Sequence, residues 1–159
     1  MVDAVDDIRS NLSLKLLDFD FDCVDHDLLL QRLHLGFGLS GVVLEWIRSF
    51  LQGRTQQVLY NGQASKVQQL SFGVPQGSVL GPLLSFLYTA ELSQVITQHG
   101  LRFHQYADES QIYISTTVSE EALAVQRFTA CVKAINDWMS SSRLKLNPTK
   151  TEVLWLGST

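Results

Sequence analysis

Residues 17–22 carry carboxylates at a spacing suited to binding a divalent cation. The segment reads Leu-Asp-Phe-Asp-Phe-Asp, so an extended chain would place Asp18, Asp20 and Asp22 together on one face. Three like charges on one strand face repel each other, so such a face needs open water, proton uptake or a bound cation. Carboxylate oxygens are ligands that Mg²⁺ prefers in proteins.

A second acidic segment, Asp108-Glu109, separates two strand-like runs, residues 101–107 and 111–116. Carboxylates from two strands that meet at one sheet edge would form a site for a hard cation. Two Mg²⁺ ions about 4 Å apart can stabilise both the attacking and the leaving oxygen of phosphoryl transfer. An ordinary exposed turn at Asp108-Glu109 is the alternative interpretation.

The remaining acidity has a simpler interpretation. Eight of the 16 Asp and Glu residues lie in the first 27 positions, and the formal net charge is −4. Clustered charges such as Asp3, Asp6 and Asp7 are usually solvated. An acidic balance argues mildly against a stand-alone nucleic-acid binder, which would usually be basic.

Length and composition predict a globular chain. The 159 residues are 45% hydrophobic and 18% charged, which suits a sizeable core and excludes a disordered segment. Cys23 and Cys131 lie far apart without a CxxC pair, which excludes a disulfide scaffold. The acidic start does not resemble a signal peptide, and the longest apolar run, residues 78–92, is too short to span a membrane. We therefore expect one intracellular domain over residues 1–159, without a membrane partner.

Hydrophobic periodicity and turn signals predict alternating helices and hairpins. Helices are expected over residues 3–11, 41–51 and 78–98, and a further helix is expected to be capped by Asp25 and to end near residues 36–38. The last expected helix, residues 119–139, has the apolar pattern Leu123, Val125, Phe128, Val132, Ile135 and Trp138. Strands are expected over residues 14–22, 54–60, 63–70, 101–107, 111–116, 143–146 and 151–156. The turn Asn61-Gly62 favours a hairpin, because both residues tolerate positive φ. Since strands come mostly as hairpins, an α+β fold is expected, an antiparallel sheet with helices packed on one face.

Five motifs occur in a fixed order along the chain. They are Leu16-Leu17-Asp18, the run from Phe21 to Leu29, the run from Gly73 to Pro82, Tyr106-Ala107-Asp108, and the run from Leu144 to Thr151. Together they resemble the reverse transcriptase domain of non-LTR (LINE-type) retrotransposons, over nearly the whole chain. Each motif is short, and their common order and spacing carry the resemblance.

The resemblance implies a polymerase palm with incomplete fingers and no thumb. In the family, two Mg²⁺ ions support attack of a DNA primer 3′-OH on an incoming deoxynucleotide, directed by an RNA template. By motif position, Asp18, Asp108 and Glu109 would be the catalytic metal ligands, and Lys150 would protonate or neutralise the leaving pyrophosphate. Phe21 would exclude a ribose 2′-OH, and Gln76 and Gly77 would line the nucleotide and template site.

Each of these roles has a purely structural alternative. The alternative is a core side chain for Phe21, a plain helix-entry turn for Gln76-Gly77, and a solvated charge for Lys150. The four histidines, which have no metal-ligand spacing with either cysteine, are expected in surface or capping roles. Trp46, Trp138 and Trp155 are expected in the core.

Two departures from the family pattern indicate a damaged site. The family places its first Asp five residues before the aromatic gate, whereas Asp18 lies three before Phe21. A two-residue loss moves a carboxylate by about 7 Å along a strand, and metal ligands tolerate only tenths of an ångström. Glu109 stands where the family has Asp, and its extra methylene shifts the carboxylate by about 1 Å, which can cost about 10²-fold in rate.

Three functional hypotheses follow from these observations. The chain is an active RNA-directed DNA polymerase fragment, a catalytically degenerate palm, or a domesticated non-catalytic module that binds nucleic acid or protein. The motif range suggests that most fingers, thumb and endonuclease parts lie outside the chain, and oligomeric state is left open. Since a fold carries function only with its site, the degenerate palm is the favoured interpretation.

Overall fold

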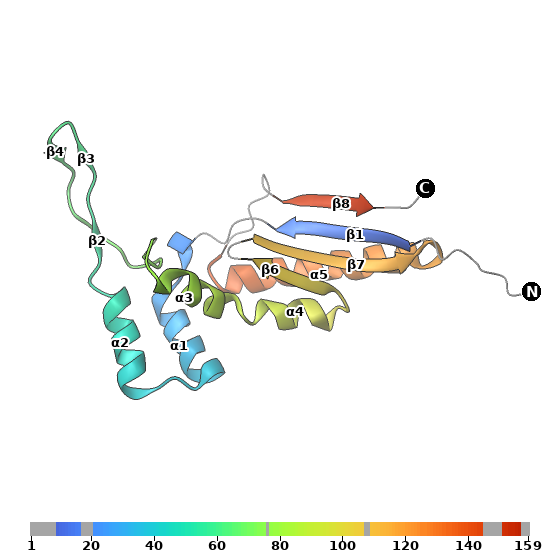
Figure 1. Ribbon diagram of the computed structural model, residues 1–159, viewed down its shortest axis with the longest axis horizontal. Helices are drawn as coiled ribbons and strands as arrows, with labels where there is room; N and C mark the ends of the chain where they lie inside the picture. Colours follow the sequence, from blue (N-terminus) through green and yellow to red (C-terminus); the bar gives the residue numbers. More distant parts are fainter. Residues whose placement is uncertain (1–8, 17–20, 76, 107–108, 145–150, 157–159) are drawn as a thin grey trace, which may run out of the picture. The chain divides into compact units, whose positions relative to one another are not determined.

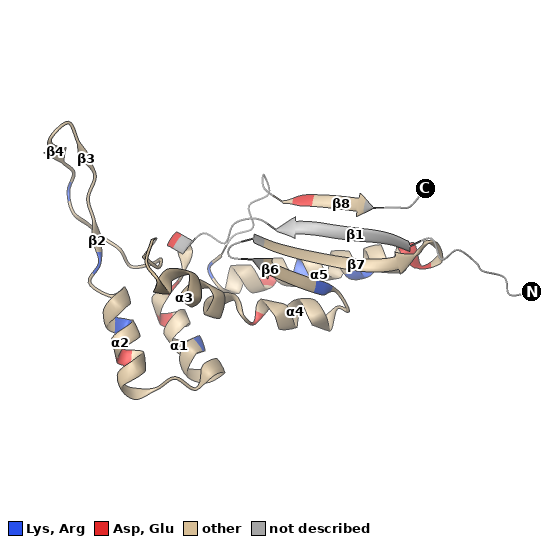
Figure 2. Ribbon diagram, in the orientation of Figure 1, with Lys and Arg blue, Asp and Glu red and all other residues tan. Residues whose placement is uncertain are grey.

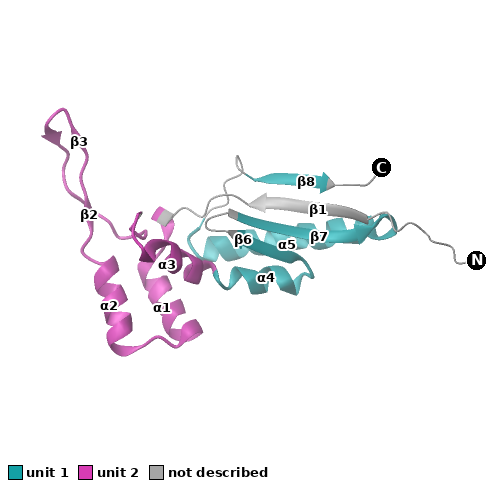
Figure 3. Ribbon diagram, viewed as in Figure 1, with its two compact units in different colours: residues 1–19, 90–159 teal, residues 20–89 magenta. Residues whose placement is uncertain are grey.

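The computed structural model describes residues 9–16, 21–75, 77–106, 109–144 and 151–156; the side chains of residues 9–16, 21, 106, 109 and 156 are not described. The chain divides into two compact units, residues 1–19 with 90–159 and residues 20–89 (Figure 3). The single domain expected over residues 1–159 stays a prediction.

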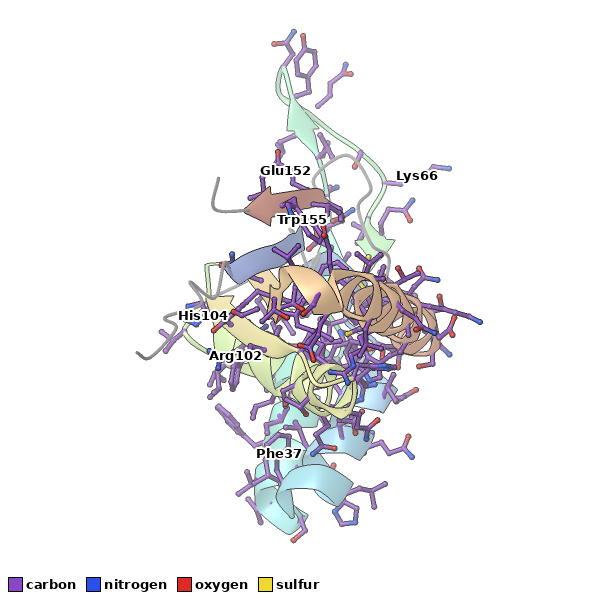
Figure 4. All side chains as sticks on the ribbon, turned by 90° about the vertical axis from the view of Figure 1, so that its right-hand side faces the viewer. Phe37, Lys66, Arg102, His104, Glu152 and Trp155 are labelled. Carbon is purple, nitrogen blue, oxygen red and sulfur yellow. The ribbon has the colours of Figure 1, made fainter. Side chains whose placement is uncertain are left out.

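The first unit contains a four-stranded antiparallel sheet in the order β6-β7-β1-β8 (Figure 1). Its strands are β1 (Arg9–Leu16), β6 (Arg102–Tyr106), β7 (Glu109–Thr117) and β8 (Glu152–Leu156). Its helices are α4 (Leu92–Gln98), η2 (Val118–Glu120) and α5 (Glu121–Ser141). Figure 4 shows α4 and α5 on the same side of the sheet, as expected for an antiparallel sheet with helices on one face.

The core of this unit lies between the sheet and its helices. α5 buries residues spaced by three or four positions, which is the spacing of one helical face: Ala124, Phe128, Cys131, Ile135 and Met139. β7 buries Ser110, Ile112, Ile114 and Thr116, at the two-residue spacing of one strand face. The two patterns meet because α5 packs against β7 and β1.

The second unit combines a helical part with a long β-ribbon. Its helices are η1 (Phe21–Cys23), α1 (His26–Phe37), α2 (Gly41–Leu51) and α3 (Leu80–Thr89). The ribbon consists of β2 (Thr55–Gln56) paired with β5 (Gln68–Gln69), and β3 (Leu59–Tyr60) paired with β4 (Gln63–Ala64). The expected Asn61-Gly62 turn is confirmed, with positive φ at both residues.

Local signals explain where α1 begins and ends. The Asp25 carboxylate accepts a hydrogen bond from the Leu28 N–H at 2.8 Å, which caps the helix, and Gly38 ends it in the left-handed conformation. Leu29, Leu30 and Leu33 turn inward and are buried. The predicted cap and the predicted end of this helix are both confirmed.

The main differences from expectation concern strand and helix boundaries. Residues 9–11 belong to β1 rather than to a helix, and Asp22 lies exposed in η1 rather than on a strand face. The helix expected over residues 78–98 is interrupted between Thr89 and Leu92. Arg143 and Leu144 form no strand, because the Leu144 N–H bonds back to the Met139 carbonyl at 2.8 Å and Arg143 adopts a φ of 56°.

Among the described residues, no helix is both long and apolar enough to cross a membrane.

Candidate active site

Strand pairing in the first unit brings three chain segments to one end of the sheet. Leu16, the last residue of β1, pairs with Ser110, and the hairpin of β6 and β7 closes at the pair Tyr106 and Glu109. At the same end, β8 begins at Glu152, which pairs with Lys15 (Figure 1). We call this the 16/110/152 end of the sheet.

The sequence connects the predicted catalytic residues to this end. Asp18 follows Leu16 by two residues, Asp108 precedes Ser110 by two, and Lys150 precedes Glu152 by two. Asp18, Asp108 and Lys150 lie outside the described residues, and of Glu109 only the backbone is described, as the first residue of β7. The carboxylate strand expected over residues 17–22 also lies partly outside the described residues, and its described member, Asp22, is in η1.

The carboxylates predicted for this end are of a type that binds divalent cations. Asp18, Asp108 and Glu109 offer hard carboxylate oxygens, and their chain neighbours converge by pairing. No cluster of three or more His, Cys, Asp or Glu side chains that could hold a metal exists within the described ranges. The backbone arrangement therefore fits the metal use that the sequence resemblance implies, while the ligand geometry itself is not described.

Ser110 adds a polar atom to this end of the sheet. Its side chain is 1% exposed, and its hydroxyl oxygen has no hydrogen-bond partner among the described atoms. A buried hydroxyl without a partner carries a desolvation cost of about 1–3 kcal/mol. No sequence pattern indicates this, because a serine in a strand has the same appearance whether or not its hydroxyl is bonded.

The second unit holds two predicted nucleotide-site segments together through Gly73. The Gly73 N–H donates to the Val24 carbonyl at 2.8 Å, and Phe72 forms a β-bridge with Asp25. A Cβ added to Gly73 would lie 2.9 Å from the Asp22 Cα, so only glycine allows this approach. The segment that begins at Phe21 is thereby fixed to the segment that leads to Gly77.

The side chains of His26 and Arg54 strengthen this contact. The Gly73 carbonyl accepts a hydrogen bond from His26 Nε2 at 2.8 Å and another from Arg54 Nη1 at 2.8 Å. Because a carbonyl only accepts, Nε2 of His26 carries the hydrogen of this bond. His26 is buried, so the surface role expected among the alternatives for it was wrong. We call His26, Arg54, Gly73 and the segment from Asp22 to Asp25 the Gly73 clasp.

The loop after the clasp turns directly into α3. The Ser78 hydroxyl donates to the Pro75 carbonyl at 2.6 Å and accepts from the Gly81 N–H at 2.9 Å. Gly77 has a φ of 75°, which glycine adopts without strain, and Gln76 lies outside the described residues. This part of the loop is a defined helix-entry turn, and its contact with a nucleotide stays a prediction.

The tryptophans and cysteines differ in how deeply their side chains are buried. Trp46 is 56% and Trp155 40% exposed, so the expectation that both lie in the core was wrong, while Trp138 is half-buried. Both cysteines are free thiols, as expected. Cys131 is fully buried on α5, and burial raises the pKa of its thiol to about 11.

Comparison with solved structures defines the class of fold. The apo telomerase of Candida tropicalis, truncated from its C-terminal domain, superposes with a TM-score of 0.69 at 13% identity, covering 96% of this chain and 32% of that one. A Candida albicans telomerase in complex with a fragment of telomeric RNA gives 0.69 at 14% identity, covering 94% and 28%. These similarities support the α+β, palm-like fold.

Sequence comparison identifies the family. The model of the family described as "Reverse transcriptase (RNA-dependent DNA polymerase)" matches residues 5–158. The RNA-directed DNA polymerase from mobile element jockey of Drosophila funebris is 32% identical over 118 residues, 70% of this chain. The probable RNA-directed DNA polymerase from transposon BS of Drosophila melanogaster is 33% identical over 139 residues, 82% of this chain. The chain belongs to the reverse transcriptase family, and the predicted resemblance to retrotransposon reverse transcriptases is confirmed.

The chain is short beside these relatives. It spans 13% of the length of the jockey protein and 15% of that of the BS protein. Family membership implies use of a divalent metal, whereas the metal-binding residues of this chain stay a prediction.

Proposed function

We propose that this chain is the palm portion of a retrotransposon RNA-directed DNA polymerase whose nucleotidyl-transfer site is impaired. The observation that carries the proposal is the 16/110/152 end, where the pairs Leu16–Ser110 and Tyr106–Glu109 lie beside the start of β8. Each of the three predicted catalytic segments continues from this end. Family membership supplies the reaction, and the strand register supports the position of its site.

The proposed roles follow the chemistry of each side chain. Asp18, Asp108 and Glu109 would hold Mg²⁺, which when bound supplies charge neutralisation at the phosphate oxygens. Lys150 would donate a proton or its positive charge to the leaving pyrophosphate. Phe21 would exclude a ribose 2′-OH, and Gln76 and Gly77 would line the nucleotide and template site.

The Gly73 clasp supports a shared location for Phe21 and Gly77, which are proposed to line the nucleotide and template site. Gly73 lies so near the Asp22 backbone that a Cβ added to it would be 2.9 Å from the Asp22 Cα, and Asp22 follows Phe21 directly. Gly77 lies four residues after Gly73, in the turn that leads into α3. An RNA template, a DNA primer and deoxynucleotides are the proposed partners, by family membership.

The impairment rests on the first motif and on position 109. Asp18 lies two residues too close to Phe21 for the family pattern, and Glu109 replaces an Asp. Each change moves a carboxylate by more than the tenths of an ångström that metal ligands tolerate. Both changes act on the same metal site, so their costs combine.

Primer extension tests this proposal. We expect no incorporation of deoxynucleotides on an RNA template with Mg²⁺ or Mn²⁺, and incorporation clearly above background would refute impairment.

Glu109→Asp combined with two residues inserted after Phe19 repairs both departures. Activity in the repaired chain but not in Glu109→Asp alone would locate the main defect in the first motif. A repaired chain that stays inactive would instead place the main defect in polymerase parts outside residues 1–159.

A second candidate function rests on the β-ribbon. Arg54 and Lys66 are the only charged residues in positions 54–69, so the ribbon is purely basic within an acidic chain (Figure 2). Its exposed apolar side chains include Val58, Leu59 and Tyr60. A non-catalytic module that binds nucleic acid through this ribbon would lose affinity on Lys66→Ala, with a smaller salt dependence. Unchanged binding to a primer–template at low salt would exclude this alternative.

A further inference from the structure

The free edge of β8 is the least protected surface of the sheet in the first unit. β8 is the last strand in the order β6-β7-β1-β8, and within the described residues it pairs only with β1. The outward-facing N–H and C=O groups of an edge strand are a template for pairing with another strand. A strand, rather than a helix or a small molecule, is therefore the partner that this edge fits.

The side chains of β8 are exposed on both faces of the sheet. Val153 is 62%, Leu154 46% and Trp155 40% exposed. Because successive strand side chains point to opposite faces, Leu154 lies on one face and Val153 and Trp155 on the other. Added strands would therefore find apolar contacts on both faces.

The opposite edge of the sheet, strand β6, exposes polar side chains. β6 presents exposed Arg102 and His104, and both lie far from Glu152 and Trp155 in the end-on view of Figure 4. Exposed polar side chains give an added strand little apolar area to bury. β8 also carries one charged residue, Glu152, but its next three side chains, Val153, Leu154 and Trp155, are apolar and exposed. The contrast between the two edges singles out β8 as the one suited to pairing.

The sequence of β8 is complementary to itself in one orientation. In an antiparallel pair centred on Leu154, Glu152 lies opposite Leu156 and Val153 opposite Trp155. No like charges face each other, and two pairs of an aromatic with a β-branched residue form, which stabilise antiparallel strands. A parallel pair in register would instead place Glu152 opposite Glu152. We propose that two copies of this chain associate through antiparallel β8–β8 pairing, forming one continuous eight-stranded sheet.

This arrangement goes beyond the proposed polymerase site. β8 begins at the 16/110/152 end, so the two-fold axis through Leu154 directs the two candidate sites to opposite ends of the shared sheet. A two-fold axis makes the interface isologous, with the same patch used on both copies. The association therefore closes at a dimer and leaves both candidate sites uncovered by the pairing.

Sedimentation over a wide range of protein concentration tests the proposal. We expect the purified chain to associate reversibly to a dimer, and we expect Leu154→Lys, which sets two lysines opposite each other, to remain monomeric. The matched control is Leu123→Lys, a change from a leucine on α5 that is 45% exposed against 46% for Leu154, which should leave the dimer intact. A chain that is monomeric at every concentration would overturn the proposal, as would a dimer that survives Leu154→Lys.

Cross-linking tests the register without disturbing the charge. Leu154→Cys, in a Cys23→Ser background, should form an intermolecular disulfide with a mild oxidant, because directly opposed residues lie about 4.5–5.5 Å apart between Cα atoms. Cys131 is fully buried and serves as an inert thiol. Val153→Cys, whose partner position is Trp155, should cross-link far more slowly. Equal cross-linking at both positions would overturn the proposed register.

Discussion

Gly73→Ala is the substitution for which the structure gives the sharpest expectation. Gly73 has a φ of 83°, and its added Cβ would lie 2.9 Å from the Asp22 Cα and 3.1 Å from the Asp22 carbonyl oxygen. Both atoms belong to the backbone, so relief requires the Phe21–Asp25 segment to move. The substitution therefore acts on the Gly73 clasp, which fixes this segment to the loop before α3.

Gly77→Ala in the same loop is the matched control. Gly77 has a φ of 75°, but nothing lies within 4 Å of its added Cβ. Left-handed backbone costs an alanine about 1–2 kcal/mol, and the lower entropy of the unfolded chain returns about 0.4–1 kcal/mol. Gly77→Ala should therefore destabilise by about 1 kcal/mol. Overpacking adds about 1–3 kcal/mol at position 73, so Gly73→Ala should cost about 2–4 kcal/mol.

Urea unfolding, followed by far-ultraviolet circular dichroism, measures this difference. The two variants should have similar m-values and differ in midpoint, with Gly73→Ala unfolding at the lower urea concentration. His26→Ala, which removes one of the two donors to the Gly73 carbonyl, should also destabilise the chain, by about 1–3 kcal/mol. Equal midpoints for Gly73→Ala and Gly77→Ala would refute the close approach on which the clasp depends.

Three further predictions concern buried or capping groups. Burial raises the pKa of Cys131 from 9.0 to about 11, so between these pH values the unfolded state loses its proton first and stability falls by about 3 kcal/mol as pH rises; urea midpoints for wild type and Cys131→Ala should converge above pH 9, and parallel curves would contradict this. Ser110→Ala removes a buried hydroxyl without a described partner and should leave the melting temperature unchanged or raised, whereas a loss above about 1 kcal/mol would mean that the hydroxyl is bonded. Asp25→Ala removes the cap on the Leu28 N–H and should cost about 1 kcal/mol, whereas Ser40→Ala, at a cap without a side-chain hydrogen bond, should cost much less; equal losses in thermal melts would contradict the cap assignment.

Sequence patterns predicted the local elements better than the boundaries that depend on tertiary pairing. The cap at Asp25 and the turn at Asn61-Gly62 were found because each acts through its own neighbours. Residues 9–16 also alternate, with Leu12, Leu14 and Leu16 at the two-residue spacing. Because the alternation after Leu16 is stronger, the predicted strand began at residue 14, whereas β1 begins at Arg9. β1 is set by partners on both sides, β7 and β8, which no local pattern reveals.

Burial was harder to predict than secondary structure. On α5, Leu123 and Val125 belong to the apolar pattern that predicted the helix, but both are exposed, and Ala124 is buried. The inner face of a helix is fixed by what packs against it, here β7, and a surplus of apolar residues leaves the choice open. His26 was missed for a similar reason, because its partner, the Gly73 carbonyl, lies 47 residues away in the chain.

The candidate site, too, could be predicted from the sequence only in part. Motif order predicted which segments meet, and the pairs Leu16–Ser110 and Lys15–Glu152 agree with the meeting of three of them. The roles of Asp18, Asp108 and Lys150 remain predictions, because these residues lie outside the described part of the chain. Sequence could not indicate the Gly73 clasp, which arises from close backbone approach.

Paramagnetic broadening by Mn²⁺ tests most directly whether the 16/110/152 end is the cation site. Substoichiometric Mn²⁺ should broaden the backbone amide signals of Leu16, Tyr106 and Ser110 most strongly. The pair Arg9 and Thr117 lies at the other end of the same strands, about 23 Å away at 3.3 Å per residue, and should be little affected. Asp108→Asn should weaken the effect. Broadening centred instead on Thr117, near the exposed Glu120, or spread evenly over the sheet, would contradict this position of the cation site.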